Sequence, residues 1–332
     1  MMATGGATDD YRYSRQMVLP EVGAQGQARL AAASVLVVGA GGLGCPVLQY
    51  LCAAGVGRLL IVDHDRVDES NLHRQPLYRM SDLGEPKARA AAAAMRLLNP
   101  RARVEEAIER VTPRNAAAWI SRADVIVDAA DSLALTDILS DECRQQGKPL
   151  VSASVLGLSG YVGAFCGGAP SYRAVFPEMP RQAGSCAQSG VLGTAVGVMG
   201  ALQAHITLAL LLKLTPTALG QLTSIDFSTL RCSGFSFAAA PEPAGPALRF
   251  IAPEEVRSAD VVVDLRSLTE APVSPFAGAL RVGVEDVERA GLPGTTSARV
   301  VLCCRSGIRA WRAAQALRRS GHADLALIAL GD

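Results

Sequence analysis

A glycine-rich segment follows an apolar run near the start of the chain, and these two features together constrain the fold most strongly. Residues 34–38 read SVLVV and residues 39–44 read GAGGLG. The β-branched run predicts a buried strand, and the apolar residues 45–54 predict a helix that ends at Gly55. A second buried strand is predicted at 58–62 (RLLIV). This β-loop-α-β order is the beginning of a parallel, doubly wound α/β sheet.

The alternation of apolar strands and helices continues to about residue 237. An alanine-rich helix is predicted at 86–98, and further buried strands are predicted at 124–128 (DVIVD) and from 149 onward. The chain has 332 residues, of which 49% are hydrophobic and 19% are charged. This length suits two domains, and this composition is too apolar and too evenly charged for a disordered chain. Residues 1–237 are therefore assigned to a first domain with a Rossmann-like, doubly wound sheet.

A second α/β pattern begins after a segment rich in proline, alanine and glycine. Residues 238–248 read AAAPEPAGPAL, which is typical of a linker. Beyond it, strands are predicted at 260–265 and 299–303, and a helix with one apolar face is predicted at 306–319. Residues 249–332 are enough for a small domain, so we predict a second, smaller α/β domain there.

Charge and cysteine content limit the classes of function. The formal net charge is +1, so the chain lacks the overall basic field that drives nucleic-acid binding. Eight cysteines are present without a C-x-x-C pair, and the N-terminal residues carry acids and no apolar stretch. These features predict free thiols, no signal peptide and a cytoplasmic location.

One apolar segment, residues 191–212, is long enough to span a membrane. It contains Gly193 and Gly197 at GxxxG spacing, which also occurs in membrane helices. However, Gln203 and His205 lie in its second half, and no basic cluster flanks it. We predict instead a buried helix, packed inside the domain or at a dimer interface, and no membrane association.

Three glycines, Gly39, Gly41 and Gly44, match the G-x-G-x-x-G pattern of nucleotide-binding loops. Glycine permits a tight turn and a close approach of phosphates, and the N-terminus of the following helix offers N–H groups to an anion. Asp63 ends the second strand, where a carboxylate can accept hydrogen bonds from the ribose of NAD or ATP. An ordinary strand–helix turn and an NAD(P) dehydrogenase are the alternative interpretations.

The residues that follow Asp63 are unusual for a dehydrogenase. The segment 70–75 reads SNLHRQ, and Lys87 comes after it. Two cations and an amide suit a triphosphate, whose charge has to be neutralised during transfer, while surface charges on a loop are the alternative. Asp131 follows the DVIVD strand, where a carboxylate can hold Mg²⁺ between phosphates, unless it caps the helix expected from Ser132.

These motifs together resemble the MoeB/ThiF enzymes, which are prokaryotic relatives of ubiquitin-activating enzymes. The resemblance covers residues 11–237 and includes GAGGLG, D-x-D-x-V-x-x-S-N-L-x-R-Q, G-x-P-K, A-x-D-S and the Y-S-R-Q at 13–16. It implies ATP-dependent adenylation of the C-terminal glycine of a ubiquitin-fold sulfur carrier. It also implies a homodimer in which Arg15 reaches the phosphates of the partner subunit, and catalytic roles for Lys87 and Asp131. The residues expected to bind ATP are Gly39, Gly41, Gly42, Asp63, Ser70, Asn71, Leu72, His73, Arg74, Gln75, Lys87, Asp131 and Ser132, with Asp131 as the ligand of Mg²⁺.

The cysteines of the first domain are unusual for that family in one respect and typical in another. Many members bind zinc with two C-x-x-C pairs, the first just before an F-P-E segment, but here residues 171–178 read SYRAVFPE. Cys232 is alone near the expected second pair, so we predict no zinc. Cys186 lies where sulfur-transferring members have a cysteine in a mobile loop that can link covalently to the carrier. A small buried thiol is the alternative.

Cys304 lies in a second motif, CCRSGIRA at 303–310, between a predicted strand and a predicted helix. In such a loop, backbone N–H groups, a helix N-terminus and two arginines favour a thiolate or a persulfide. Cys303 is predicted to face the core. This motif and the VVVDLR at 261–266 resemble rhodanese-like domains, in which Cys304 would carry a persulfide. The stretch between 265 and 282 is short for that family, so a non-catalytic docking domain is the alternative.

The two resemblances together imply an adenylyltransferase fused to a rhodanese-like sulfur donor. The expected cofactors are ATP and Mg²⁺, and the expected partners are a sulfur carrier ending in Gly-Gly and a sulfur source such as a cysteine desulfurase. Cys304 would deliver the sulfur directly or through Cys186. Two alternatives stay open. One is adenylation of a peptide or another carboxylate with a vestigial rhodanese domain, and the other is a scaffold that binds a ubiquitin-fold partner without catalysis.

Overall fold

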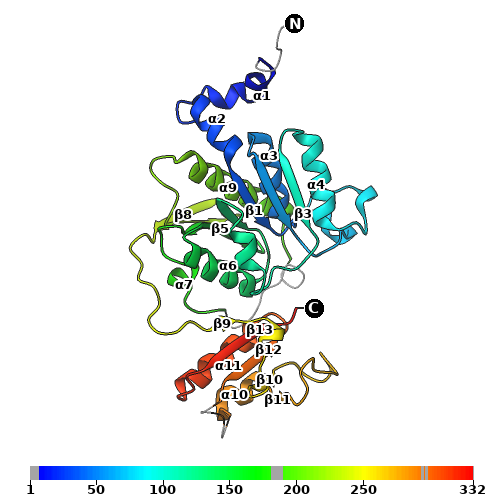
Figure 1. The fold of residues 1–332 in the computed structure, drawn as a ribbon, viewed down its shortest axis with the longest axis vertical. Coiled ribbons are helices and arrows are strands. Elements are labelled where there is room, and N and C mark those ends of the chain that lie inside the picture. Colours follow the sequence, from blue (N-terminus) through cyan, green and yellow to red (C-terminus); the bar gives the residue numbers. More distant parts are fainter. Residues whose placement is uncertain (1–6, 181–189, 293–294, 296–297, 332) are drawn as a thin grey trace.

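An eight-stranded sheet forms the centre of the first domain (Figure 1). The computed structural model describes residues 7–180, 190–292, 295 and 298–331. The strands of this sheet are β1 (Ser34–Val38), β2 (Arg58–Val62), β3 (Arg103–Ala107), β4 (Val125–Asp128), β5 (Pro149–Leu156), β6 (Ser159–Cys166), β7 (Gln221–Asp226) and β8 (Arg231–Ser236). They lie in the order β3-β2-β1-β4-β5-β6-β7-β8. The first five are parallel, and β6, β7 and β8 extend the sheet in antiparallel pairs.

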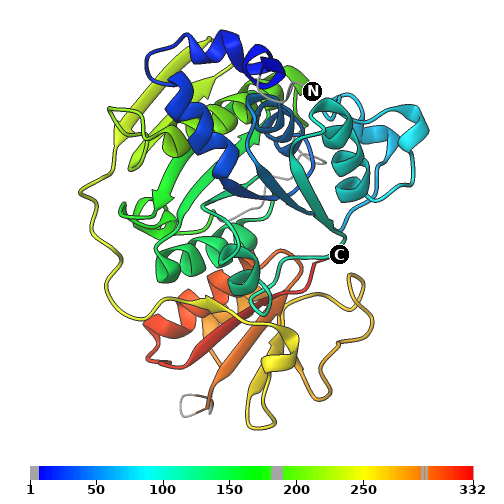
Figure 2. The same ribbon diagram turned by 45° about the horizontal axis from the view of Figure 1, so that its top comes forward.

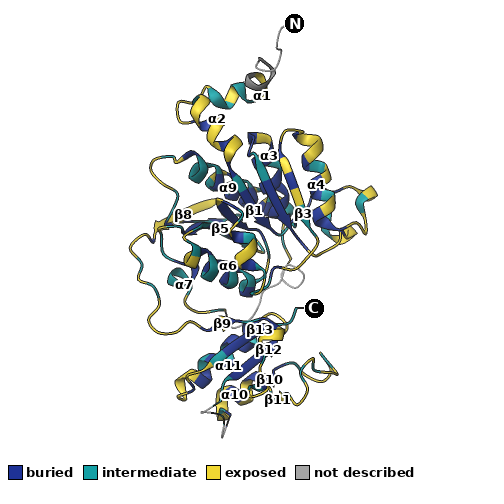
Figure 3. Cartoon of the chain, viewed as in Figure 1, coloured by how far each residue is buried: buried dark blue, intermediate teal, exposed yellow. Residues whose placement is uncertain are grey.

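Helices cover both faces of this sheet. They are α1 (Ala7–Met17), α2 (Gly23–Ala32), α3 (Gly44–Ala54), α4 (Lys87–Leu98), α5 (Ala116–Ile120), α6 (Leu133–Gln146), α7 (Tyr172–Val175) and α9 (Gly193–Leu212), with single helical turns η1 (Glu69–Asn71) and η2 (Met80–Asp82). Successive side chains of a strand point to opposite faces. In β1, Val35 and Val37 therefore pack into a core with α3, α4 and α9, whereas Leu36 and Val38 pack into a second core with α5 and α6. Burial on both faces explains the unbroken apolar runs, and Figure 3 shows it as buried strands between half-exposed helices.

The strands predicted at 34–38 and 58–62 are confirmed with the same bounds. The helix predicted from residue 45 begins one residue earlier and ends before Gly55, which has a left-handed φ of 88°. The helix predicted from residue 86 begins at Lys87 instead. Local sequence is thus sufficient to place these elements, because each has a long apolar run and a clear glycine or proline at its end.

The apolar segment predicted as a buried helix forms α9, which packs against α3, β5 and β6. Gln203 is fully buried there, and its amide nitrogen donates hydrogen bonds to the backbone carbonyls of Asp128 (2.6 Å) and Val151 (3.0 Å). Of the helices in the described residues, α9 has the length and composition needed to cross a membrane, and half of its most apolar window is buried in the fold. Its packing against α3 and the sheet explains the apolar residues on that side of the helix, whereas Val198 on another side is 45% exposed.

The second domain contains a separate five-stranded parallel sheet. Its strands are β9 (Arg249–Phe250), β10 (Val261–Asp264), β11 (Leu280–Arg281), β12 (Val300–Cys304) and β13 (Leu325–Ala329), in the order β11-β10-β12-β13-β9. The helices α10 (Val284–Ala290) and α11 (Ile308–Arg319) and the turn η3 (Pro253–Glu255) accompany them. The predicted α/β fold class is confirmed for both parts of the chain. The strand predicted at 299–303 extends to Cys304, so this cysteine ends the strand and does not lie in the loop after it.

The linker segment 238–248 runs without helix or strand along the side of the first domain (Figure 2). Ser171 donates to the carboxylate of Glu242 through its backbone N–H (2.8 Å) and its hydroxyl (2.6 Å). Farther along, Arg173 donates to the carbonyl of Leu248 (3.2 Å). The second sheet then lies beyond the carboxyl ends of the parallel strands of the first sheet. Ligands of open α/β sheets bind at that same edge.

Candidate functional site

The glycine loop joins β1 to α3 at the carboxyl edge of the first sheet. Gly39 has a φ of 95°, and its N–H donates to the carbonyl of Val62 at 2.9 Å. A Cβ on Gly39 would lie 2.8 Å from the carbonyl oxygen of Ala129, and a Cβ on Gly44 would collide with the carbonyl oxygen of Gly39. Both positions therefore require glycine, and the N-terminus of α3 lies directly against the loop, as in loops that bind phosphates.

Asp63 follows β2 and is buried next to the glycine loop. One carboxylate oxygen accepts the N–H of Ala40 (2.7 Å), and the other accepts the N–H of Asp65 (2.7 Å). Burial raises the pKa of Asp63, and the two N–H bonds and the nearby Lys87 act in the opposite direction without reversing the shift. Each oxygen keeps a further acceptor site, so the carboxylate that fixes the loop can also accept a hydroxyl from a bound ribose.

Lys87 is the first residue of α4, and its side chain is only 7% exposed. Its ammonium lies 2.9 Å from a carboxylate oxygen of Asp65, whose side chain is 53% exposed. Burial alone would raise the pKa of Asp65, but the hydrogen bond and charge of Lys87 outweigh it, and the pKa lies below its usual value. A cation in the first helical turn opposes the helix dipole, so helix stability does not explain Lys87.

The segment 68–75 lies beside the glycine loop. Asp68 caps η1 by accepting the backbone N–H of Ser70 at 2.9 Å, and Arg74 donates to the carbonyl of Ser70 at 3.1 Å. Gln75 is buried, and its amide nitrogen lies 3.7 Å from the position of a Cβ on Gly41. Its amide oxygen has no hydrogen-bond partner in the described part of the chain. A buried amide oxygen without a donor fits a site completed by a ligand.

The N-terminus of α9 closes this side of the site. A Cβ on Gly193 would collide with the carbonyl oxygen of His73, and a Cβ on Gly42 would lie 2.6 Å from the side chain of Val196. The glycine loop, the segment around His73 and the first turn of α9 are therefore in direct contact. Cys186, the second predicted sulfur-handling residue, lies outside the described residues.

Asp131 and Ser132 follow β4 on the other side of the loop. Ser132 is the N-cap of α6, because its hydroxyl accepts the N–H of Leu135 (3.4 Å). The alternative that Asp131 caps this helix is therefore wrong. Asp131 is exposed, and within the described ranges no hydrogen bond or ion pair engages its carboxylate. An available carboxylate beside a phosphate-type loop is the oxygen ligand that Mg²⁺ requires, so the donor set fits the predicted metal.

Asp128 holds the loop that carries Asp131, and this role was not predicted from the sequence. Asp128 is fully buried and accepts hydrogen bonds from the hydroxyls of Thr136 (2.7 Å) and Ser152 (2.8 Å) and from the N–H of Ala130 (3.3 Å). Burial raises its pKa to about 6, although these hydrogen bonds lower it. The sequence feature that could have indicated this role is the position of Asp128 itself, an acidic residue at the end of an otherwise apolar strand.

Tyr78 is a second residue that supports the site and was not predicted from the sequence. Its buried hydroxyl donates to the carbonyl of Ala40 at 2.6 Å and lies 3.3 Å from the carbonyl of Lys87. Burial raises its pKa well above the usual value. The tyrosine therefore joins the glycine loop to the start of α4, and nothing in the local sequence distinguishes it from an ordinary core tyrosine.

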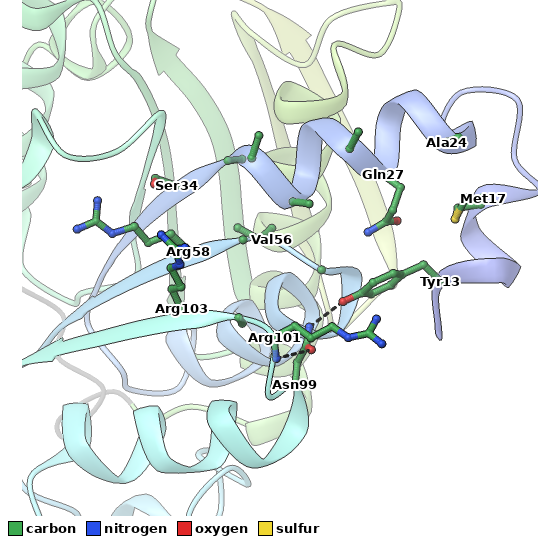
Figure 4. A pocket seen from close by; sticks show the side chains of 17 residues that line it. Tyr13, Met17, Ala24, Gln27, Ser34, Val56, Arg58, Asn99, Arg101 and Arg103 are labelled. Carbon is green, nitrogen blue, oxygen red and sulfur yellow. Dashed lines mark hydrogen bonds between the residues drawn. The ribbon is translucent and has the colours of Figure 1, made fainter. Parts of the chain in front are cut away.

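Arg15 lies apart from these residues in this chain. It is exposed on α1, which packs at the amino ends of the strands. There Tyr13 accepts a hydrogen bond from Asn99 (2.9 Å) and lines a cavity of about 760 Å³ with Gln27 and Arg58 (Figure 4). The predicted site residues thus form one group at the carboxyl edge, and Arg15 does not belong to it within a single chain.

Cys304 lies at the end of β12 and is fully buried. Its sulfur accepts the backbone N–H groups of Gly307 (3.2 Å) and Ala310 (3.4 Å), the first of which caps α11. Arg309 forms two hydrogen bonds with the carboxylate of Glu270 (2.7 and 2.5 Å). That pairing raises the pKa of Arg309, and the nearby Cys304 sulfur adds to the effect. Two N–H donors and a guanidinium are thus arranged to stabilise a negative sulfur.

The remaining described cysteines have other positions. Cys303 is buried on the opposite face of β12, as predicted, and burial raises its pKa to about 12. Cys232 is exposed on β8. One group of three metal-ligand side chains occurs in the described residues, Asp63, His64 and Asp65, with ligand atoms within 4.8 Å of one another. Asp63 and Asp65 are already engaged with backbone N–H groups and Lys87, which leaves Asp131 as the better candidate for a cation.

The fold and the loop geometry define a Rossmann-like α/β protein with a phosphate-type glycine loop and an additional small domain. Residues 13–246 match the ThiF family, and the chain belongs to this family. The match covers the whole glycine-loop site and ends within the linker.

Among similar proteins, bovine "Adenylyltransferase and sulfurtransferase MOCS3" is 49% identical over 218 residues, which are 65% of this chain and 48% of the bovine protein. "Sulfur carrier protein adenylyltransferase" of Thermus thermophilus is 45% identical over 223 residues, covering 65% of this chain and 82% of that protein. "SAMP-activating enzyme E1" of Haloferax volcanii is 44% identical over 208 residues. The chain spans about half the length of the MOCS3 proteins that it matches.

Solved structures of E. coli MccB have the same fold. The structure of MccB with ATP superimposes with a TM-score of 0.59 at 21% identity, covering 72% of this chain and 74% of MccB. The structure of MccB with MccA-N7isoASN gives a TM-score of 0.60 at 20% identity. At this level of identity, the likeness concerns the fold.

Proposed function

We propose that this protein adenylates the C-terminal glycine of a ubiquitin-fold sulfur carrier with ATP and then converts it to a thiocarboxylate. The observation that carries the proposal is the single group formed by the glycine loop, Arg74, Lys87 and Asp131 at one sheet edge. The 45% identity to a sulfur carrier protein adenylyltransferase, over 82% of that protein, supports the choice of substrate class.

The adenylation step needs charge neutralisation and no side-chain nucleophile. A carboxylate is a poor electrophile, because its leaving group would be oxide. Attack of the carrier carboxylate on the α-phosphorus of ATP breaks the bond to pyrophosphate and gives an acyl-adenylate, whose AMP leaves readily. Lys87 and Arg74 stabilise the charge on the phosphates in this step, and Arg15 of a second copy adds to it in the proposed homodimer. Asp131 would hold Mg²⁺, which supplies further neutralisation between the phosphates.

The sulfur-transfer step uses the second domain. A persulfide on Cys304, loaded by a donor such as a cysteine desulfurase, attacks the carbonyl carbon of the adenylate, and AMP leaves. The product is an acyl disulfide between carrier and Cys304. A second thiol, from Cys186 or a small molecule, then attacks the Cys304 sulfur, forms a disulfide with it and releases the carrier thiocarboxylate. The two N–H groups at the Cys304 sulfur support this role because they stabilise the anionic sulfur. A cytoplasmic location, which would keep these thiols reduced, is part of the proposal.

Pyrophosphate exchange into ATP tests the first step. The protein is mixed with Mg²⁺, labelled pyrophosphate, ATP and a candidate carrier ending in Gly-Gly, with the carrier lacking these two glycines as the control. Exchange that requires the Gly-Gly end is expected, and Asp131→Ala should abolish it. If a short peptide supports exchange and none of the carriers does, the result would support peptide adenylation instead. If neither a peptide nor a carrier supports exchange, the result would favour a scaffold.

Mass spectrometry of the carrier tests the second step. Replacement of the carboxylate oxygen by sulfur increases the carrier mass in a way that is resolved from the adenylate. Cys304→Ala should retain exchange and lose the thiocarboxylate. A variant that still forms the thiocarboxylate at the normal rate would show that the second domain is not the sulfur donor.

A further inference from the structure

The loop that holds the Cys304 sulfur lies against the nucleotide edge of the first domain. A Cβ on Gly307, which has a φ of 87°, would lie 3.1 Å from the Cβ of Ala134 and 2.7 Å from the ring of Phe250. Ala134 is in the first turn of α6, three residues after Asp131. Ala134 and Cys304 are fully buried in the same apolar cluster. One of the two N–H donors to the Cys304 sulfur, Gly307, is thus the residue that contacts α6, the helix that begins two residues after the predicted metal ligand Asp131.

A second contact lies on the other side of the nucleotide edge. The backbone N–H groups of Leu330 and Gly331 donate to the carbonyls of Cys304 and Arg305, both at 2.9 Å. Gly331 is so close to Arg110 that a Cβ on it would overlap the guanidinium. Arg110, which follows β3, lies 2.9 Å from the imidazole of His64, the neighbour of Asp63. The Cys304 segment is therefore linked to the first domain on this side as well, through Gly331 and Arg110.

Further contacts keep the second domain in this position. Arg114, at the carboxyl edge of the first sheet, lies 3.7 Å from Glu254 of η3. Phe250 packs near Ile138 of α6, where only a small cavity of about 130 Å³ remains. Ile138 and Met179 of the first domain complete the apolar cluster of the second. The shared apolar cluster, together with this ion pair, indicates a specific docked arrangement.

We propose that sulfur is delivered within one chain, so that the persulfide on Cys304 serves the adenylate formed at the nucleotide edge of that same chain. This inference rests on the proposed function and adds the identity of the donor subunit. In the docked arrangement the Gly307 loop faces α6, at the sheet edge where the adenylate would form. The persulfide sulfur attacks the acyl carbon, AMP leaves, and a second thiol releases the thiocarboxylate by forming a disulfide with Cys304.

Mixed subunits test this assignment. Asp131→Ala removes adenylation from one chain, and Cys304→Ala removes sulfur delivery from the other. The two variants carry different tags, are co-expressed and are purified as mixed dimers. Because Arg15 is intact in both chains, its contribution across the dimer is unaffected. Delivery within one chain predicts thiocarboxylate at the background level. Mixed dimers of wild type with the double variant contain one intact chain and should retain about half of the wild-type rate per dimer. Equal rates in the two mixed dimers would overturn the proposal.

Pyrophosphate exchange separates failure of this inference from failure of the proposed function. The Cys304→Ala chain should exchange normally, and the wild-type protein should form the thiocarboxylate. Absence of exchange in wild type would overturn the proposed function itself. Normal exchange together with thiocarboxylate formation in the Asp131→Ala/Cys304→Ala mixed dimer would overturn only delivery within one chain.

A substitution at the domain contact provides an independent test. Ala134→Arg places a long side chain at the buried contact with Gly307, whereas Ala93→Arg makes the same substitution on the exposed side of α4. Both variants should retain pyrophosphate exchange. The thiocarboxylate rate should decrease about tenfold or more in the first variant, because misplacement by an ångström has effects of this size. Equal thiocarboxylate rates in the two variants would overturn the role of the docked arrangement.

Discussion

The ammonium nitrogen of Lys87 lies 2.9 Å from a carboxylate oxygen of Asp65, and this pair places a buried cation at the nucleotide edge. The lysine stem is enclosed by the fold, but the carboxylate is half exposed and can be displaced by a phosphate. The helix dipole opposes a cation at this position. The pair therefore directs positive charge toward a ligand, and it contributes little to the stability of α4.

Lys87→Met should reduce pyrophosphate exchange by about a hundredfold or more, which is typical when a charge-stabilising group is lost. The melting temperature should change little, because Asp65 becomes rehydrated when its partner is removed. Asp65→Asn is the matched control, since it keeps the lysine charge and should have a much smaller effect on exchange. Near-normal exchange in Lys87→Met would show that Lys87 does not contact the phosphates.

Gly44→Ala should destabilise the protein and weaken ATP binding together. Its Cβ would overlap the carbonyl oxygen of Gly39, so that α3 has to move away from the loop. Overpacking of this kind costs about 1–3 kcal/mol. The control is Gly197→Ala in α9, where a Cβ would have no atom within 4 Å. This substitution should stabilise the helix by about 0.5–1 kcal/mol. Urea unfolding and ATP titration measure both effects, and an unchanged ATP affinity in Gly44→Ala would contradict the loop assignment.

Asp128→Asn should change the pH dependence of stability. Burial raises the pKa of Asp128 from 3.8 to about 6, so the native state binds this proton more tightly than the unfolded state. The corresponding stability is present below about pH 4 and is lost as the pH rises through 6. Between these pH values, the contribution of Asp128 to the free energy of unfolding changes by at most about 3 kcal/mol, at about 1.4 kcal/mol per pKa unit.

The measurement is the free energy of unfolding of wild type and Asp128→Asn from pH 4 to 7. The wild type should lose stability relative to the variant over this range. Asp137, whose pKa burial raises to about 7, is present in both proteins, so its contribution cancels in the comparison. Parallel curves would mean that Asp128 titrates normally.

Tyr78→Phe should raise the KM for ATP. The hydroxyl that fixes the carbonyl of Ala40 is lost, and the glycine loop becomes less well positioned. Loss of one hydrogen bond costs about 1 kcal/mol of stability. Tyr161→Phe removes the bond to the hydroxyl of Tyr172 (2.6 Å) on the other face of the sheet, and provides a control with a similar stability change. The KM for ATP should increase only in Tyr78→Phe. An equal increase in Tyr161→Phe would show that Tyr78 contributes to the core and does not position the glycine loop.

The strands SVLVV and RLLIV and the glycine turn between them could be predicted because their signals lie within a few residues of one another. Prediction was weaker at element ends. The sequence reading left open whether Asp131 caps α6, and only the hydroxyl of Ser132, placed against Leu135, decides that it does not. Likewise, β12 includes Cys304 because its backbone pairs with β13, a segment about twenty-five residues later.

The residues that support the site could not be predicted locally. Asp128 is bound by side chains from α6 and β5, and its carbonyl accepts the amide of Gln203 from α9. Tyr78 contacts a carbonyl 38 residues earlier in the chain. Each is an ordinary polar or aromatic residue in its own segment. Its role arises from the convergence of distant elements at one sheet edge.

The sequence by itself determined the α/β class, the glycine loop, the cationic segment after β2 and the cysteine motif at 303–310, because local periodicity and backbone requirements encode these features. Tertiary structure decided how the parts meet. The hydroxyls that bind Asp128 and the packing of Gly307 against Ala134 depend on contacts between residues from different elements of the chain. Those contacts form only when the elements that carry them have buried their apolar surfaces against one another, and no short stretch of sequence contains that information.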